Sequence, residues 1–163
     1  MKPRVLTITV SDTRTAADDT AGQALADELS AFEIVGHERV QDDATAIAAL
    51  VTSRAQSGDV DALVLTGGTG IAPRDVTFEA VSALFDKTLD GFGEAFRRLS
   101  WDEIGPRAIL SRATAGTVGP CLVFVVPGSE KGARLGARAL IAPVLTHAVD
   151  LAHGRTKHGK PAT

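Results

Sequence analysis

Short strand-type segments alternate with longer helix-type segments along this 163-residue chain, and this alternation restricts its fold more than any other feature. The strand-type segments are rich in β-branched and other apolar residues, whereas the segments between them carry apolar residues at helical spacing. Strands are predicted at Arg4–Val10, 34–40, Ala62–Thr66, 109–115 and Cys121–Val126, and helices at 20–32, 44–55, 77–84, 94–101 and 133–145, with Pro143 kinking the last. This order favours a three-layer α/β sandwich with a mostly parallel sheet.

Length and composition indicate one globular domain over residues 1–152, followed by a polar, flexible tail at 153–163. The net charge of −3 argues against nucleic acid or an anionic membrane as a partner. Because no signal-peptide pattern and no apolar run of about 18 residues occur, we expect a cytoplasmic protein. The single cysteine, Cys121, excludes an intrachain disulfide, and no Cys/His motif suggests zinc.

A glycine-rich stretch that directly follows the third predicted strand indicates phosphate binding. Its glycines permit positive φ and close backbone approach, its threonines add hydroxyl donors, and Asp75 supplies a hard oxygen for Mg²⁺. The alternative is a merely flexible connection, but Pro73 stiffens the loop and a helix follows it. The spacing matches neither a Walker A loop nor a dinucleotide fingerprint, whose third glycine position holds Pro73. The loop residues are Thr66, Gly67, Gly68, Thr69 and Gly70.

Polar residues also follow the other predicted strands. Ser11 and Asp12 follow the first, Asp42 and Asp43 the second, and the 127–129 turn the last. Each has a local alternative, since Asp42 or Asp43 and Ser129 suit helix N-caps and Asp12 suits a turn. Because ligands of open parallel sheets bind outside the carboxyl ends of the strands, we expect these clusters to share one site. Carboxylates from separate loops beside a phosphate cradle fit Mg²⁺.

Taken in order, five motifs resemble the motif series of the MoaB/Mog family of molybdenum cofactor biosynthesis proteins. They lie at 66–70, 73–77, 91–94, 110–112 and 127–129, and the resemblance extends over residues 5–151. The family includes molybdopterin adenylyltransferases and the G domain of gephyrin. The resemblance implies the molybdopterin-binding fold, assembly as trimers or hexamers, and a Mg²⁺-dependent reaction in which ATP adenylylates molybdopterin and pyrophosphate is released.

The resemblance also implies roles for individual residues. Asp42 and Asp75 match the two acidic positions associated with catalysis, where they would position Mg²⁺ on the phosphates of ATP. The implied nucleotide- and molybdopterin-binding residues are Ser11, Asp12, Thr66, Gly67, Gly68, Thr69, Gly70, Ser111, Pro127, Gly128 and Ser129.

Two other functions compete with the adenylyltransferase. One is a protein that binds or assembles molybdopterin without catalysis, which would need the loop amides but not two carboxylates that position a metal. The other is a nucleotide pyrophosphatase of the CinA type, which shares a Thr-Gly-Gly loop. The 74–77 continuation and the 127–129 turn favour the Mog-type function over the CinA type.

Overall fold

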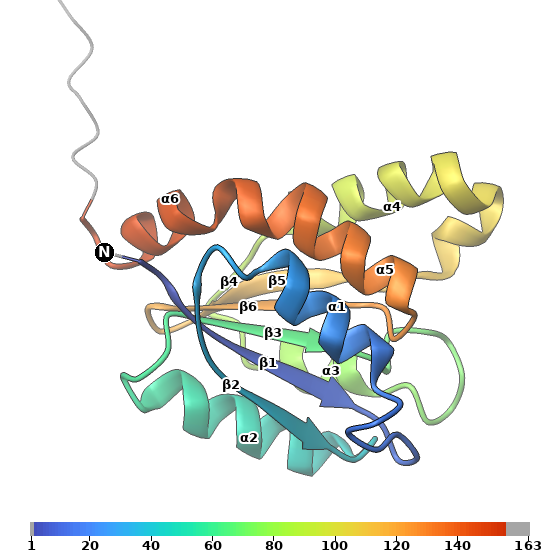
Figure 1. Cartoon of the computed structure of the whole chain (residues 1–163), viewed down its shortest axis with the longest axis horizontal. Helices are drawn as coiled ribbons and strands as arrows, with labels where there is room; N and C mark the ends of the chain where they lie inside the picture. The colour runs from blue at the N-terminus through green and yellow to red at the C-terminus, as the bar shows by residue number, and fades with distance from the viewer. Residues whose placement is uncertain (1, 156–163) are drawn as a thin grey trace, which may run out of the picture.

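The computed structural model describes residues 2–155 and shows a six-stranded sheet with helices on both faces (Figure 1). The strands are β1 (Arg4–Val10), β2 (Glu33–Val40), β3 (Ala62–Thr66), β4 (Lys87–Thr88), β5 (Thr114–Val118) and β6 (Cys121–Val126). Their order is β2-β1-β3-β6-β5-β4, in which the first four are parallel and the β6–β5 and β5–β4 pairs are antiparallel. The expected α/β sandwich with a mostly parallel sheet is confirmed.

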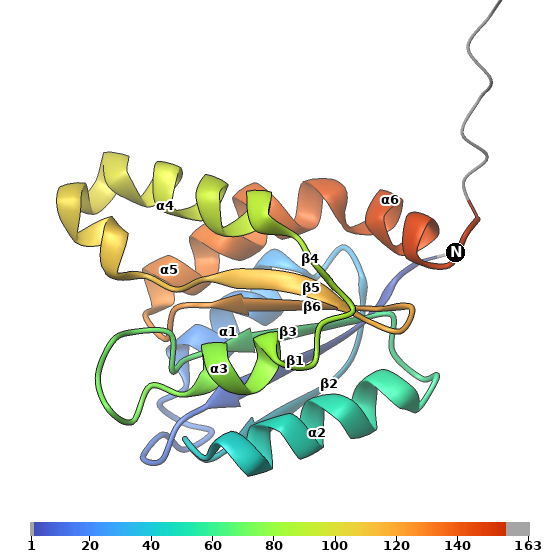
Figure 2. The same ribbon diagram turned by 180° about the vertical axis from the view of Figure 1, so that it is seen from behind.

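Two layers of helix cover the sheet because its central strands are apolar on both faces. The helices α1 (Thr20–Glu28), α4 (Asp90–Ile104), α5 (Glu130–Leu135) and α6 (Ala142–Ala152) lie on one face, and α2 (Ala44–Gln56) and α3 (Thr77–Ser82) lie on the other (Figures 1 and 2). Phe124 of β6 belongs to the core under α5 and α6, whereas its neighbours Val123 and Val125 belong to the core under α2 and α3. The uninterrupted apolar run of β6 therefore reflects a strand that is buried on both sides.

The last helical segment is longer than predicted. Helix starts at Glu130, passes through a π-helical turn at Gly136–Ile141 and continues as α6, with Pro143 in the first turn of α6. The wide turn directly before Pro143 fits a residue that cannot donate a backbone hydrogen bond. By length and composition alone, Glu130–Ala152 is long and apolar enough to cross a membrane. Its apolar residues pack against the sheet, including Ile141 and Leu145, which are fully buried.

The prediction of a strand at 109–115 is wrong. A 3-10 helix occupies Gly105–Leu110, and strand β5 begins only at Thr114. Gly105 ends α4 in a left-handed conformation with φ +61°, and Pro106 follows it. Ile109 looked like a strand residue because it is apolar, but 67% of it is exposed. The short edge strand β4 was not predicted.

Helix boundaries also differ from the predicted ones. Helix α1 ends at Glu28 instead of residue 32, and Phe32 packs against the core from the turn that follows. Thr77, predicted as a helix N-cap, is the first residue of α3, and Val76 at the cap position makes no side-chain cap bond.

The strand register places the carboxyl ends of β1, β3 and β6 side by side. Thr66 of β3 lies opposite Thr9 of β1 and Val126 of β6. The backbone N–H of Gly67 donates to the carbonyl of Val126 over 3.1 Å, which extends the β3–β6 pairing into the glycine loop. The loops that follow these strands therefore leave the sheet along one common rim.

The opposite end of the sheet is joined through Asp61. Its carboxylate accepts from the backbone N–H, Nε and Nη2 of Arg4 at 2.9 to 3.2 Å, and Nε2 of His153 lies 3.5 Å away. The start of β1 and the end of α6 thus meet at one buried carboxylate. Of the predicted flexible tail, residues 156–163 lie outside the described residues.

Candidate active site

A pocket of about 940 Å³ opens along the rim where β1, β3 and β6 end. Its walls come from the loops after these strands, from α4 and from the start of α5. Of the residues that the sequence assigned to the site, all except Asp12 line it: Ser11, Asp42, Thr66, Gly67, Gly68, Thr69, Gly70, Asp75, Ser111, Pro127, Gly128 and Ser129. The expectation that polar clusters from separate loops converge is therefore met.

The glycine loop turns sharply at its first two glycines. Gly67 has φ +110° and Gly68 has φ +65°, conformations that favour glycine. Gly70 does not share this conformation, contrary to the prediction for all three. Position 70 leaves no room for a side chain because Asp75 lies against it. A Cβ at Gly70 would be 2.6 Å from Asp75 Oδ2. Two of the glycines thus shape the turn, and the third makes room for a carboxylate.

The loops after β3 and β6 are held together at close range. The hydroxyl of Thr66 donates to the carbonyl of Pro127 over 2.7 Å, so this hydrogen bond holds the two loops together. A Cβ at Gly128 would lie 3.2 Å from the Cα of Gly67. Ser129 N-caps α5, since its Oγ accepts from the backbone N–H of Gly132. The 127–129 turn therefore fixes the position of the glycine loop.

Asp42 is fixed by the loop after β1. Its Oδ2 accepts from the backbone N–H of Asp12 over 3.2 Å, and its own N–H donates to Asp12 Oδ1 over 3.0 Å. The N-cap of α2 is Asp43, whose Oδ1 accepts from Ala46 N–H, so Asp42 does not cap the helix. Burial, reinforced by the negative charge of Asp12, raises the pKa of Asp42.

Asp75 closes the turn that follows the glycine loop. Its Oδ2 accepts from the backbone N–H of Ala72 over 2.9 Å, and its own N–H donates to the carbonyl of Ala72. A Cβ at Gly68 would lie 3.3 Å from Asp42 Oδ1, just as one at Gly70 would meet Asp75. The two carboxylates thus flank the glycine loop. Within residues 2–155, no group of three or more His, Cys, Asp or Glu side chains could hold a metal ion by itself.

Arg112 clamps this loop, a role that sequence reasoning did not assign. Its backbone N–H donates to the carbonyl of Thr69 over 3.1 Å, its Nε to the carbonyl of Gly70 and its Nη2 to that of Asp75, both over 2.9 Å. The remaining Nη1 pairs with Glu79 of α3, and the guanidinium carbon lies over the ring of Phe78, 5.3 Å from its centroid. The one available signal was the motif at 110–112, which marks the position without revealing its contacts.

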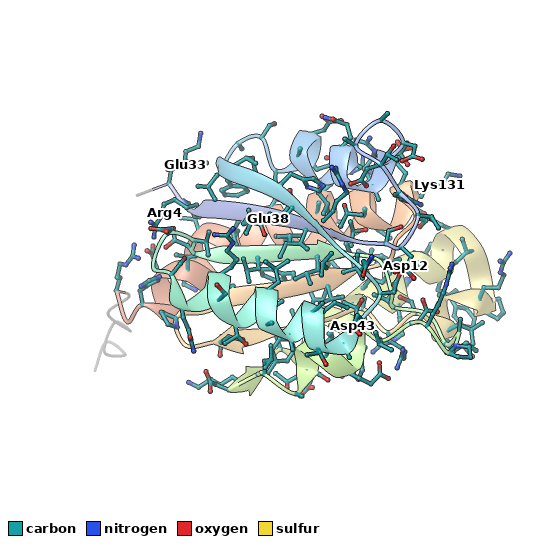
Figure 3. All side chains as sticks on the ribbon, turned by 90° about the horizontal axis from the view of Figure 1, so that it is seen from below. Arg4, Asp12, Glu33, Glu38, Asp43 and Lys131 are labelled. Atoms are coloured by element: carbon teal, nitrogen blue, oxygen red, sulfur yellow. The ribbon has the colours of Figure 1, made fainter. Side chains whose placement is uncertain are left out.

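Basic side chains that the sequence analysis did not single out also line the pocket. They are Arg14, Arg74, Arg107 and Lys131, and within the described chain none of them forms an ion pair. Figure 3 shows Lys131 toward the same end of the molecule as Asp12 and Asp43, away from Arg4 and Glu33. Cations without partners, together with the glycine loop, suit a ligand that carries several negative charges.

The fold and the site define an α/β domain built to hold an anionic ligand at the carboxyl edge of its sheet. Residues 6–147 match a family model described as a probable molybdopterin binding domain. The chain therefore belongs to the MoaB/Mog family of molybdopterin-binding domains, as its motifs predicted.

Individual relatives agree over nearly the whole chain. Molybdenum cofactor biosynthesis protein B of Bacillus cereus is 46% identical over 143 residues, which cover 86% of this chain and 85% of the relative. A crystal structure of a molybdenum cofactor biosynthesis protein B is 44% identical, with a TM-score of 0.91 over 94% of this chain and 98% of the other. The tungsten cofactor synthesizing protein MoaB from Pyrococcus furiosus is 36% identical, with a TM-score of 0.82 over 95% and 98% of the two chains.

The CinA-type alternative has support at the level of the fold alone. The protein CinA from Thermoplasma acidophilum is 16% identical and superposes with a TM-score of 0.58 over 90% of this chain and 98% of the other. A shared fold does not carry a function across such a distance.

Proposed function

We propose that this protein acts in molybdenum cofactor biosynthesis as a molybdopterin adenylyltransferase. The curated relatives are named for that pathway, and the family model is one of molybdopterin binding. The observation that carries the catalytic part is the placement of Asp42 and Asp75, from two separate loops, on either side of the glycine loop.

In the proposed reaction, an oxygen of the molybdopterin phosphate attacks the α-phosphorus of ATP. The bond between the α-phosphorus and the bridging oxygen to the β-phosphate breaks, and pyrophosphate leaves. The product carries AMP joined to the former molybdopterin phosphate through a new phosphoanhydride bond. Catalysis of this kind depends mainly on positioning the two phosphates and neutralising their charge.

The site contains residues for both tasks. Arg74, Arg107 and Lys131 line the pocket and would offset the charge of the phosphates, while Asp42 and Asp75 would hold Mg²⁺ together with oxygens of ATP. The two carboxylates fit Mg²⁺ because it prefers oxygen ligands. Mg²⁺ also keeps several of its water molecules, so two carboxylates and the substrate phosphates are enough to complete its coordination. When bound, Mg²⁺ supplies charge neutralisation and a fixed geometry for the ATP phosphates.

Purified protein incubated with molybdopterin, ATP and Mg²⁺ tests the proposal, with adenylylated molybdopterin and pyrophosphate measured by chromatography. We expect product from the wild type and very little from Asp75→Asn, which keeps the acceptor for Ala72 N–H but loses the negative charge. Normal turnover by this variant at saturating Mg²⁺ would remove Asp75 from the mechanism.

A molybdopterin-binding protein without catalytic activity is the second candidate, and one observation favours it. Each carboxylate already accepts a backbone N–H, Asp42 from Asp12 and Asp75 from Ala72, so each also has a structural task. Stoichiometric binding of molybdopterin without any product in the same assay would select this function.

A further inference from the structure

Three buried polar side-chain atoms lack a hydrogen-bond partner within the described chain, and all three lie around the same pocket. They are Nη1 of Arg14, Oγ of Ser111 and Oγ1 of Thr77. Arg14 and Ser111 line the pocket, and Thr77 lies directly behind Gly68, where a Cβ would strike its hydroxyl. A buried donor without a partner destabilises the folded protein, and the effect is larger if the donor is charged. Such a concentration of unpaired groups indicates that a ligand completes them.

Arg14 is the most informative of the three because its charge defines the partner. The described chain contains no salt bridge from Arg14 and no hydrogen bond from its side chain, although Asp42, Asp75, Glu103 and Glu130 line the same pocket. By contrast, Arg112, beside the same loops, uses its whole guanidinium on protein acceptors.

The loop that carries Arg14 is held rigidly at the rim. The Oγ of Ser11 accepts from the backbone N–H of Thr13 over 3.3 Å and from that of Arg14 over 3.1 Å. Ser11 N–H donates to the carbonyl of Val40 over 2.9 Å, and Asp12 is bound to Asp42. The backbone of Arg14 is thus fixed at the rim of the pocket by its own turn.

We infer that Arg14 binds a phosphate group of the substrate, with its buried Nη1 donating to a phosphate oxygen. A guanidinium suits this task because its donors lie in a fixed plane that matches two oxygens of a phosphate. The inference rests on the proposed function, in which either ATP or molybdopterin supplies the phosphate. It also gives Ser11 a specific role, since the Ser11 hydroxyl shapes the turn that presents Arg14.

Isothermal titration of wild type, Arg14→Met and Arg14→Lys tests the inference, with ATP in one arm and molybdopterin in the other. We expect Arg14→Met to raise the Kd of the phosphate donor that Arg14 contacts by tenfold or more and to leave the other Kd within about twofold. Arg14→Lys should recover part of the affinity through charge alone. The arm that changes identifies which phosphate is bound.

The melting temperature separates this role from a structural one. Because Nη1 has no partner within residues 2–155, Arg14→Met should melt at or above the wild-type temperature without ligand, while its stabilisation by the affected ligand shrinks. Arg98→Met is the matched control, since Arg98 forms an exposed pair with Asp102, and both Kd values should stay at the wild-type level.

Unchanged affinity of Arg14→Met for both ligands would overturn the inference, and so would a clearly lower melting temperature of the unliganded variant. Failure of the proposed function shows differently, since the wild type itself would then bind neither ligand or would bind both without forming product.

Discussion

Asp12 and Asp42 each accept the backbone N–H of the other, at 3.2 Å and 3.0 Å, although thirty positions separate them. The two bonds join the loop after β1 to the loop after β2. They also bring the carboxylate of Asp12 close to that of Asp42, which lines the pocket, and this arrangement is unfavourable when both are charged. The site therefore carries an electrostatic cost that the fold has to offset elsewhere.

Asp42→Asn should stabilise the protein while it abolishes most adenylylation. Burial and the charge of Asp12 raise the pKa of Asp42 above the ordinary 3.8, so the folded state binds this proton more tightly than the unfolded state does. Asp42 therefore lowers stability once pH has risen from about 4 through its folded pKa, and asparagine removes this loss. We expect an equal or higher melting temperature at pH 7 and a difference that vanishes below pH 4. A lower melting temperature at pH 7 would contradict this account.

Gly68→Ala should lose more stability than Gly119→Ala, although both glycines have left-handed backbones, with φ +65° and φ +57°. A side chain in this conformation costs about 1–2 kcal/mol at either position. Among the residues that the structure describes, nothing lies within 4 Å of a Cβ at Gly119, whereas a Cβ at Gly68 would collide with Thr77. Chemical denaturation should show a further loss of about 1–3 kcal/mol for Gly68→Ala, accompanied by weaker ligand binding. Equal losses for the two variants would mean that the loop can move away from Thr77.

Arg112→Met should release the glycine loop without unfolding the domain. The side chain of Arg112 supplies the donors that bind the carbonyls of Gly70 and Asp75, so its loss leaves both loop segments without their clamp. Displacement of catalytic groups by about 1 Å costs roughly 100-fold in rate, and we expect kcat/KM to fall by that order. Hydrogen exchange should accelerate at 69–75 and stay unchanged in β1. Unchanged exchange at 69–75 would show that the loop is held without Arg112.

Asp19→Ala should destabilise the fold and alter its response to acid. Asp19 N-caps α1 and accepts from Thr9 Oγ1, Gly22 N–H and His37 Nε2 at 2.6 to 2.9 Å. Burial tends to raise the pKa of Asp19, but these hydrogen bonds outweigh it and lower the pKa below 3.8. Its stabilisation is therefore complete above about pH 4 and is lost as pH falls through the lowered value. We expect a loss of about 3 kcal/mol at pH 7 that shrinks in acid.

The control for Asp19 is Asp27→Ala in the same helix, where an exposed carboxylate accepts from Gln23 Nε2 over 2.9 Å and lies 3.9 Å from Arg134 Nη2. Its denaturation midpoint should shift little at any pH. A comparable loss in both variants would assign the effect to helix α1 in general.

Assembly into a trimer or a hexamer remains a prediction that sedimentation can test. Trp101, Ile104, Ile109 and Leu110 are each about half exposed or more, on α4 and the 3-10 helix that follows it. A monomer gains nothing from such a surface, whereas a partner subunit would bury it. Trp101→Glu should shift the protein toward smaller species, whereas Val35→Glu, on the edge strand β2, should not. A wild-type monomer at micromolar concentration would refute the prediction.

The sequence predicted the elements whose pattern is local and missed those that depend on distant contacts. Strands such as β6 were placed correctly because an apolar run of that length needs cover on both faces. Asp42 and Asp75 were placed at the rim by the rule that loops after parallel strands share an edge. The contacts of Arg112 could not be predicted because its acceptors are backbone carbonyls at positions 69 to 75, about forty residues away. Ile109 led to the wrong prediction of a strand at 109–115 because an exposed apolar residue cannot be told from a buried one in the sequence.

The meeting of Arg4 and His153 at Asp61 has a practical consequence. This junction lies at the amino ends of the strands, whereas the pocket opens at their carboxyl ends. A dye, a surface tether or a second protein attached near this junction would therefore face away from the pocket mouth. Immobilised in this orientation, the protein would present its binding edge freely to a macromolecule that collects the ligand.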